Sequence, residues 1–169
     1  VDAGVSWTAR ENSRDWTAVA SSSDGARLVA VATGEPIFVS SDGGVNWSAH
    51  ETARSWSSVA SSANGLNLVA AANTDQLYTS VDGGQTWTAR ETSRAWVAVA
   101  SAANGTNLVA AETGGQLYVS TDAGVSWAPR EDARAWTSVA SSATGTKLMA
   151  AVTGGALYVS GDAGLTWTA

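Results

Sequence analysis

The sequence predicts an all-β protein built from a repeated unit, and three observations lead to this. Trp recurs at one fixed spacing in two series, small and β-branched residues fill most of the chain, and only 14% of the residues are charged. Strands and tight turns favour Val, Thr and Gly, whereas the helix-forming Lys, Glu, Gln and Leu are scarce here. A chain of 169 residues is long enough for one domain, residues 1–169, with its own core.

The 40-residue period continues through the whole chain without a gap. Repeats of about 40 residues that hold four strands each are typical of propeller blades. We therefore expect a β-propeller of four-stranded antiparallel blades. The two series account for all nine Trp, with Trp7, Trp47, Trp87, Trp127 and Trp167 in one and Trp16, Trp56, Trp96 and Trp136 in the other.

Each unit contains four short apolar segments separated by turn signals. In the last copy the segments are residues 136–141, 147–152, 156–160 and 165–168. Turn residues at this spacing predict short strands with tight connections. The first segment is made mostly of small residues, which suits the crowded axis of a propeller. The second is almost continuously apolar, as expected for a strand covered on both faces.

The repeat count predicts four full blades and one extra outer strand at the N-terminus. An open stack would expose blade faces and edges. Three arrangements stay open: four blades of a larger ring, two chains in one ring, or a polymer. We expect self-association or a place in a longer repeat chain, with the extra strand completing a neighbour's blade. The partial blade covers residues 1–10, with its strand at residues 5–10, and the full blades cover approximately 11–50, 51–90, 91–130 and 131–169.

A turn motif recurs between the third and fourth segments of each unit. Residues 80–87 and 160–167 fit the pattern Ser-x-Asp-x-Gly-x-Thr-Trp, and residues 40–47 and 120–127 depart from it only at the Thr position. A partial copy opens the chain at Asp2. The motif resembles the Asp-box, or bacterial neuraminidase repeat, which occurs in sialidase-like and sortilin-like propellers.

The resemblance implies that the motif stabilises the fold and lies away from any active face. Its Asp can accept hydrogen bonds from backbone N–H groups across the turn, its Gly permits a positive φ, and its Trp can cover the hairpin. A calcium loop needs several acidic residues at alternate positions, and each turn here has one. The expected structural residues are Asp42, Gly44, Trp47, Asp82, Gly84, Trp87, Asp122, Gly124, Trp127, Asp162, Gly164 and Trp167.

A polar motif, Arg-Glu-x-x-Arg-x-Trp, joins one unit to the next, and His50 replaces its first Arg in one copy. In one interpretation, the second Arg of each copy forms a ring that binds a carboxylate, a sulfate or an anionic sugar. In the other, each Arg pairs with Glu and stacks on Trp to brace the link. We favour the brace because the motif hardly varies between copies. The four residues are Arg14, Arg54, Arg94 and Arg134.

Composition excludes several function classes. The net charge of −6 offers no basic surface for nucleic acid, and no apolar run approaches the length of a membrane span. The chain has no Cys, which excludes disulfides and Cys-based zinc sites. His50 is the only His, which excludes a multi-His metal cluster. We therefore expect no catalytic residue, metal or cofactor.

Two functions stay open. The first is a non-catalytic scaffold or interaction module, extracellular or at the cell surface, with a protein or glycan ligand. The second, implied by the resemblance, is a fragment of a sialidase-like glycoside hydrolase or a glycan-binding lectin. We favour the first, because hydrolysis needs two poised carboxylates and no such pair stands out. The variable turns at residues 34–36, 74–76 and 114–116, together with the links, form the expected ligand face.

Overall fold

The computed structural model describes residues 4–169, and this part of the chain is all-β, without a helix. It accordingly holds no helix that is long and apolar enough to cross a membrane. The strands are β1 (Trp16–Ser21), β2 (Leu28–Ser40), β3 (Ser48–Ser61), β4 (Leu68–Ser80), β5 (Thr88–Ser101), β6 (Leu108–Glu112), β7 (Leu117–Ser120), β8 (Ala128–Arg130), β9 (Trp136–Ser141), β10 (Leu148–Val152) and β11 (Leu157–Ser160).

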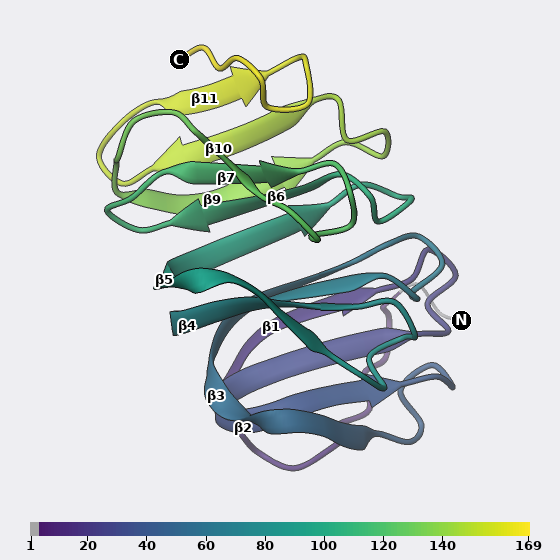
Figure 1. Ribbon diagram of the computed structural model, residues 1–169. Helices are drawn as coiled ribbons and strands as arrows, with labels where there is room; N and C mark the ends of the chain where they lie inside the picture. The colour runs from purple at the N-terminus through teal and green to yellow at the C-terminus, as the bar shows by residue number, and fades with distance from the viewer. Residues whose placement is uncertain (1–3) are drawn as a thin grey trace.

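All strand pairs are antiparallel and follow chain order (Figure 1). Strands β1 to β8 are hydrogen-bonded in one continuous sheet, and β11, β10 and β9 form a second sheet. We refer to the repeats as unit 1 (residues 11–50), unit 2 (51–90), unit 3 (91–130) and unit 4 (131–169). The units stack along the molecule from the N-terminal to the C-terminal end.

Four separate strands per unit are not what the structure shows everywhere. In unit 1 the second and third segments form one long strand, β2, with register shifts around Glu35. Strand β3 then continues through the link into unit 2, because Arg54 still pairs with Glu35 across the bulge. Unit 3 ends in the separate short strands β6, β7 and β8. Unit 4 has three strands and one further bridge, between Val159 and Thr168.

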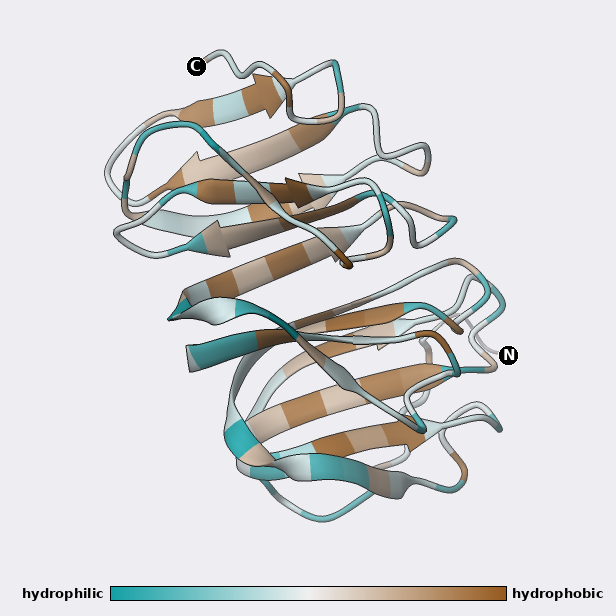
Figure 2. Cartoon of the chain, in the orientation of Figure 1, coloured by the Kyte–Doolittle hydropathy of each residue, from teal (hydrophilic) through white to brown (hydrophobic). Residues whose placement is uncertain are grey.

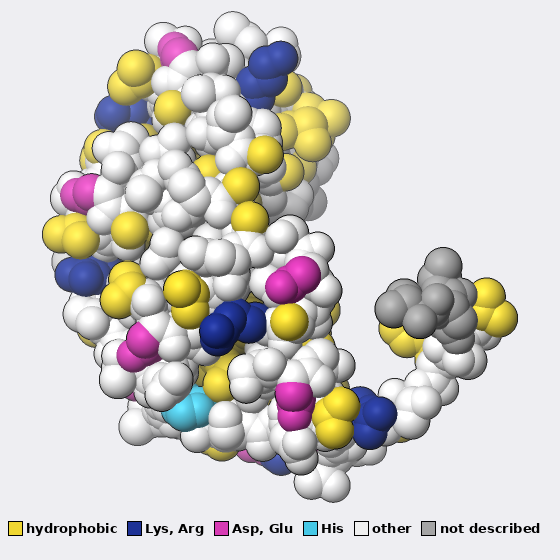
Figure 3. All heavy atoms as spheres, turned by 90° about the vertical axis from the view of Figure 1, so that its right-hand side faces the viewer, with side chains coloured by type: hydrophobic (Ala, Val, Ile, Leu, Met, Phe, Trp, Pro, Cys, Tyr) yellow, Lys and Arg dark blue, Asp and Glu magenta, His cyan; other side chains and the backbone are white. Residues whose placement is uncertain are grey.

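The extra outer strand expected at residues 5–10 is not formed. Residues 4–6 make a turn, and residues 7–10 have no regular structure. The corresponding strand β8 pairs with β7 of its own unit, whereas no described strand pairs with residues 7–10. Residues 1–3 of the expected partial blade lie outside the described residues. Figure 3 shows the segment that follows them projecting from an arc-shaped stack as an arm.

The core lies between the units. In one cluster Trp56 and Val59 of unit 2 pack with Val29, Ile37 and Val39 of unit 1. The equivalent clusters between the later units contain Trp96 and Trp136, and all three of these Trp side chains are fully buried. Figure 2 shows hydrophobic residues along the strands and hydrophilic residues at the strand ends and links. Burial of apolar faces between successive units is therefore what holds the stack together.

Backbone hydrogen bonds fix the step from one unit to the next. The N–H of Ser23 donates to the carbonyl of Ala63, Ala63 donates to Ala103, and Ala103 donates to Ala143, each at 2.8 Å. Every bond joins residues that are one repeat apart. Such a repeated interaction imposes one geometry on successive junctions.

Candidate functional site

The Ser-x-Asp-x-Gly turns are closed by hydrogen bonds to the Asp carboxylate. Asp82 Oδ1 accepts the backbone N–H of Gln85 and of Thr86, both at 3.0 Å. The Thr86 hydroxyl donates to Asp82 Oδ2 at 2.6 Å. The Ser80 hydroxyl donates to Asp82 Oδ1 at 2.8 Å and accepts the N–H of Gly84 at 2.9 Å. One carboxylate and one hydroxyl thus satisfy the polar groups of the hairpin.

The Gly and Trp of the motif complete the turn. Gly84 has φ +89°, and a Cβ there would lie 2.6 Å from Val39 of the preceding unit, so only Gly fits. Its carbonyl accepts the indole N–H of Trp87 at 2.9 Å. The same indole bond, at 3.1 Å, occurs from Trp47 to Gly44, from Trp127 to Gly124 and from Trp167 to Gly164.

The two departures from the motif keep its geometry. Asn46 donates its side-chain amide to Asp42 Oδ2 at 2.7 Å, and Ser126 donates its hydroxyl to Asp122 Oδ2 at 2.6 Å. Both replace the Thr hydroxyl as donors. The position therefore requires a short side chain with a hydrogen-bond donor, and Thr is one of three that serve.

These donors hold the carboxylates ionised far into acid. The backbone N–H of Asn46, followed by its side-chain amide, lowers the pKa of Asp42 to about 2. For Asp82, burial raises the pKa, and the bonds from Thr86 and Ser80 outweigh that effect and lower it to about 2. Hydroxyl and backbone donors also lower the pKa values of Asp122 and Asp162 to about 2. Carboxylates with such low pKa values, whose oxygens already accept hydrogen bonds from the turn, act as acceptors that close the hairpin.

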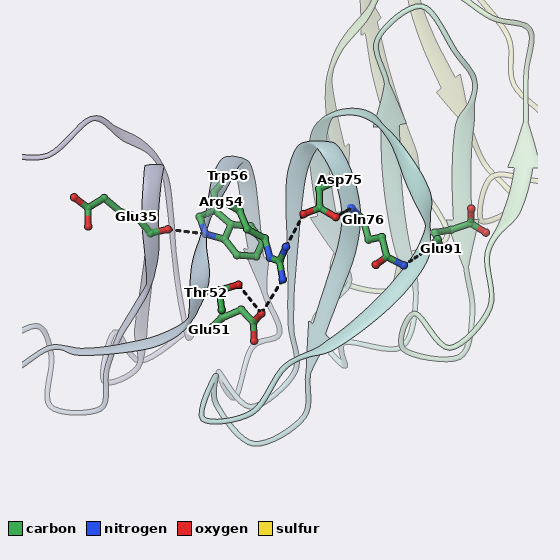
Figure 4. A network of polar contacts seen from close by, with 8 residues as sticks. All are labelled: Glu35, Glu51, Thr52, Arg54, Trp56, Asp75, Gln76 and Glu91. Atoms are coloured by element: carbon green, nitrogen blue, oxygen red, sulfur yellow. Dashed lines mark hydrogen bonds and ion pairs between the residues drawn. The ribbon is translucent and has the colours of Figure 1, made fainter.

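The links show a second arrangement, centred on Arg54 (Figure 4). Its Nη1 donates to Asp75 Oδ2 at 2.6 Å, and its Nη2 donates to Glu51 Oε1 at 3.2 Å. The guanidinium carbon lies 4.5 Å from the ring centroid of Tyr78 and 6.0 Å from that of Trp56. Two carboxylates and two aromatic rings therefore hold this guanidinium in one place.

The other three link arginines have corresponding partners. Each contacts the Glu three residues before it and one further acid, and each lies 4.3 to 4.8 Å from an aromatic centroid. All of these partners lie in the same unit as their Arg, so the contacts hold each link against its own unit; the anion-binding ring stays a prediction. The acid partners are Glu11 and Glu35 for Arg14, Glu91 and Glu112 for Arg94, and Glu131 and Asp132 for Arg134.

Sequence reasoning missed three features of the links. The Glu at the start of each link has a positive φ of 58° to 64°. Gln76 donates its side-chain amide to the carbonyl of Glu91 at 2.6 Å, and Gln116 donates to that of Glu131 at 2.8 Å. The indole N–H of Trp56 donates to the carbonyl of Glu35 in the preceding unit. The recurrence of Gln at one repeat position was the available signal for the second feature.

The remaining candidate residues have separate surroundings. Tyr78 and Tyr118 pack edge-to-face on Trp56 and Trp96, and burial raises the pKa of both phenols, so they stay protonated at neutral pH. His50 Nε2 lies 3.0 Å from the hydroxyl of Ser48. Across residues 4–169 no three His, Cys, Asp or Glu side chains form a group that could hold a metal.

Residues 78–89 match the family profile described as BNR/Asp-box repeat. The turn around Asp82 is therefore an Asp-box. The matched stretch contains the complete hairpin around Asp82 and the Tyr78 that receives the Arg54 guanidinium. No curated protein sequence matches the chain.

Solved structures with similar folds are propeller proteins. An ancestral GH74 enzyme superposes with a TM-score of 0.75 and 18% identity over 91% of this chain, but over only 24% of its own length. YCF48 bound to D1 peptide gives a TM-score of 0.62 with 14% identity, over 95% of this chain and 69% of that one. The computationally designed Ika4 protein gives 0.70 with 14% identity, over 90% and 94%. This chain thus has a propeller-like fold, which it shares with GH74 enzymes and with YCF48.

Proposed function

We propose that this Asp-box chain is a non-catalytic β-propeller that serves as a scaffold and interaction module, with each repeat unit forming one blade. The observation that carries the proposal is the use made of the repeated acids. In every unit the Asp of the turn accepts the hairpin donors, and the Glu of the link pairs with Arg. A repeated carboxylate that already has such a partner serves to stabilise the fold.

Most of the acids outside the repeat also have partners. Glu35, Asp75 and Glu112 pair with link arginines, and Asp24 accepts the hydroxyl of Ser22 at 2.6 Å. A retaining or inverting glycosidase uses two carboxylates in distinct environments on either side of a scissile bond. These partners support a module that binds without cleaving. The alternative, a fragment of a glycoside hydrolase, draws on similarity to GH74 structures that is limited to the fold.

The ligand face in this proposal combines the link arginines with the variable turns that precede the third segment. Those turns carry Glu35 with Pro36 in unit 1, Asp75 with Gln76 in unit 2, and Gly115 with Gln116 in unit 3. The ion pair between Arg54 and Asp75 brings a link and a turn into direct contact. Each link Arg on this face already pairs with two carboxylates, so a ligand carboxylate or sulfate would bind there by replacing one of those partners.

The test measures cleavage and binding side by side. The chain is incubated with sialylated and neutral glycosides to measure sugar release, and applied to arrays of sialylated, sulfated and neutral glycans and of acidic peptides. We expect no release and binding of one anionic class that Arg94→Ala weakens. The matched control is Arg10→Ala, which removes an exposed Arg that precedes the four units. Sugar release above a buffer control would overturn the proposal, as would binding that both variants reduce equally.

A further inference from the structure

The two ends of the stack expose apolar residues that every internal junction buries. In unit 1 the side chain of Val19 is 74% exposed, whereas Val59 and Val99 at the same repeat position are 6% exposed. Trp16 is likewise exposed where Trp56 is fully buried. The first unit therefore presents the surface with which each later unit contacts the one before it.

Unit 4 presents the opposite surface. Leu157 is 58% exposed, and its counterparts Ile37, Leu77 and Leu117 are fully buried. Met149 and Val159 are exposed in the same way. A groove of about 540 Å³ lined by Leu148, Met149 and Val159 opens on this face.

The two surfaces are complementary by the geometry of the internal junctions. Between units 1 and 2, Val29, Ile37 and Val39 receive Trp56 and Val59. In unit 4, the repeat positions of Val29, Ile37 and Val39 are occupied by Met149, Leu157 and Val159. In unit 1, the repeat positions of Trp56 and Val59 are occupied by Trp16 and Val19. Joining the two ends would bury on both sides what the single chain leaves in water.

The backbone ladder is open at the same two ends. Each internal step uses a donor in one unit and an acceptor at the same repeat position of the next unit. In the described chain, the N–H of Ala143 has no acceptor and the carbonyl of Ser23 has no donor. They are the donor and the acceptor of one further step.

Charge distinguishes the ends from two of the three internal junctions; at the first junction Arg27 occupies the position of the donor Asn. Internally, Asn67 donates its side-chain amide to the carbonyl of Asn104, and Asn107 donates to that of Thr144. At the same positions the ends carry charges of opposite sign. Lys147, the only Lys in the chain, replaces the donor Asn, and Asp24 replaces the acceptor residue.

The space around Gly25 agrees with this pairing. A Cβ on Gly65, Gly105 or Gly145 would lie within 2.4 to 2.6 Å of the residue that precedes it by 38 positions, whereas a Cβ on Gly25 meets nothing within 4 Å. In a further junction that open space would receive Lys147. The end of the chain that holds Asp24 is thus shaped for the end that holds Lys147.

We propose that unit 4 of one chain binds unit 1 of a second copy, in the register of an uninterrupted repeat. In this register, each residue of the second copy lies where the residue four repeat periods further along one uninterrupted chain would lie. The proposal rests on the proposed function only in treating each unit as a blade. Because the contact joins two different surfaces, it closes into a ring or extends into a filament.

The exposed arm fits this register. Trp7 is 90% exposed, and its indole N–H already donates to the carbonyl of Gly4 at 3.0 Å, as Trp167 does to Gly164. Residues 1–9 and residues 161–169 have the same sequence except at three positions. At these positions the first stretch has Val, Val and Ser, and the second has Gly, Leu and Thr. In the assembly, the arm of the second copy and the C-terminal hairpin of the first compete for one place beside β11.

The test compares sedimentation of the 169-residue chain with that of variants over the micromolar range. The wild type is expected to form dimers or longer assemblies, and Val19→Asp is expected to weaken them about tenfold or more, because a buried Val is lost. Val81→Asp is the control: Val81 is also exposed, but it lies on a turn within the stack. Circular dichroism verifies that each variant is folded.

A second pair of variants tests the register. Asp24→Asn and Lys147→Asn each restore the residue type found at internal junctions, so the fold is retained. Both are expected to assemble with less dependence on salt than the wild type. A folded wild type that stays monomeric, or equal weakening by Val19→Asp and Val81→Asp, would overturn the docking. Neither result bears on the cleavage and array measurements, which judge the proposed function separately.

Discussion

Arg94 Nη1 lies 3.5 Å from Oε2 of Glu112. Glu112 does not occupy the repeat position of the acids that pair with Arg14 and Arg54. Those acids, Glu35 and Asp75, share one repeat position, and the third unit has Gly115 at that place. Glu112, the last residue of β6, supplies the carboxylate from an earlier repeat position. The link Arg therefore keeps a second acidic partner, although that partner comes from a different repeat position. This is expected if the guanidinium of the brace has to be neutralised.

The brace predicts a measurable coupling between these two residues. In a double-mutant cycle, Arg94→Ala and Glu112→Ala are expected to show an interaction free energy of about 0.5 to 1 kcal/mol, a modest value because both groups are partly exposed. Arg94→Ala alone should cost more than Glu112→Ala, since it also removes the stacking on Tyr118. Chemical denaturation measures all four proteins. Strictly additive effects would show that the pair contributes nothing.

A single substitution in unit 2 should stabilise the fold. Thr74 has φ +61°, and the corresponding residues Gly34, Gly114 and Gly154 have φ between 66° and 76°. A β-branched residue in this region is strained, and the Thr74 side chain is exposed to solvent. Thr74→Gly is expected to raise the free energy of unfolding by about 1 kcal/mol. Thr92→Gly, at an exposed position without positive φ, is the control and should be destabilising.

The Asp-box carboxylates predict loss of stability in acid. Their folded pKa values, about 2, lie below the usual value of 3.8. Their contribution is therefore complete above pH 3.8 and is lost as the pH falls toward 2. The melting temperature should drop across this interval. The drop should be smaller in Asp82→Asn, which keeps an acceptor oxygen but no longer titrates; an identical pH profile would contradict the assignment.

The sequence predicted the periodic parts of this molecule better than its junctions. The hairpin of Asp82 follows from residue types within one short motif, so the pattern alone shows which groups can bond. The second partner of Arg94 depends on how a turn folds back over a link, and no local pattern encodes that. The N-terminal strand was expected because its residues match β8, and it is absent because a strand also needs a partner.

Two of the buried Trp residues differ in one hydrogen bond and so permit a matched comparison. The indole N–H of Trp56 donates to the carbonyl of Glu35 at 2.9 Å, whereas that of Trp136 is buried without an acceptor among residues 4–169. Both side chains are fully buried and pack edge-to-face on a Tyr, at centroid distances of 5.2 and 5.1 Å. Replacement by Phe removes similar volume at both sites.

We therefore expect Trp56→Phe to be more destabilising than Trp136→Phe by about 1 kcal/mol, the net value of one hydrogen bond. The smaller cost at Trp136 arises because Phe also removes a buried donor that has no partner in the described part of the chain. Urea denaturation followed by circular dichroism measures both variants without relying on Trp fluorescence. Equal destabilisation would mean that the bond to Glu35 adds nothing to the packing that the two sites share.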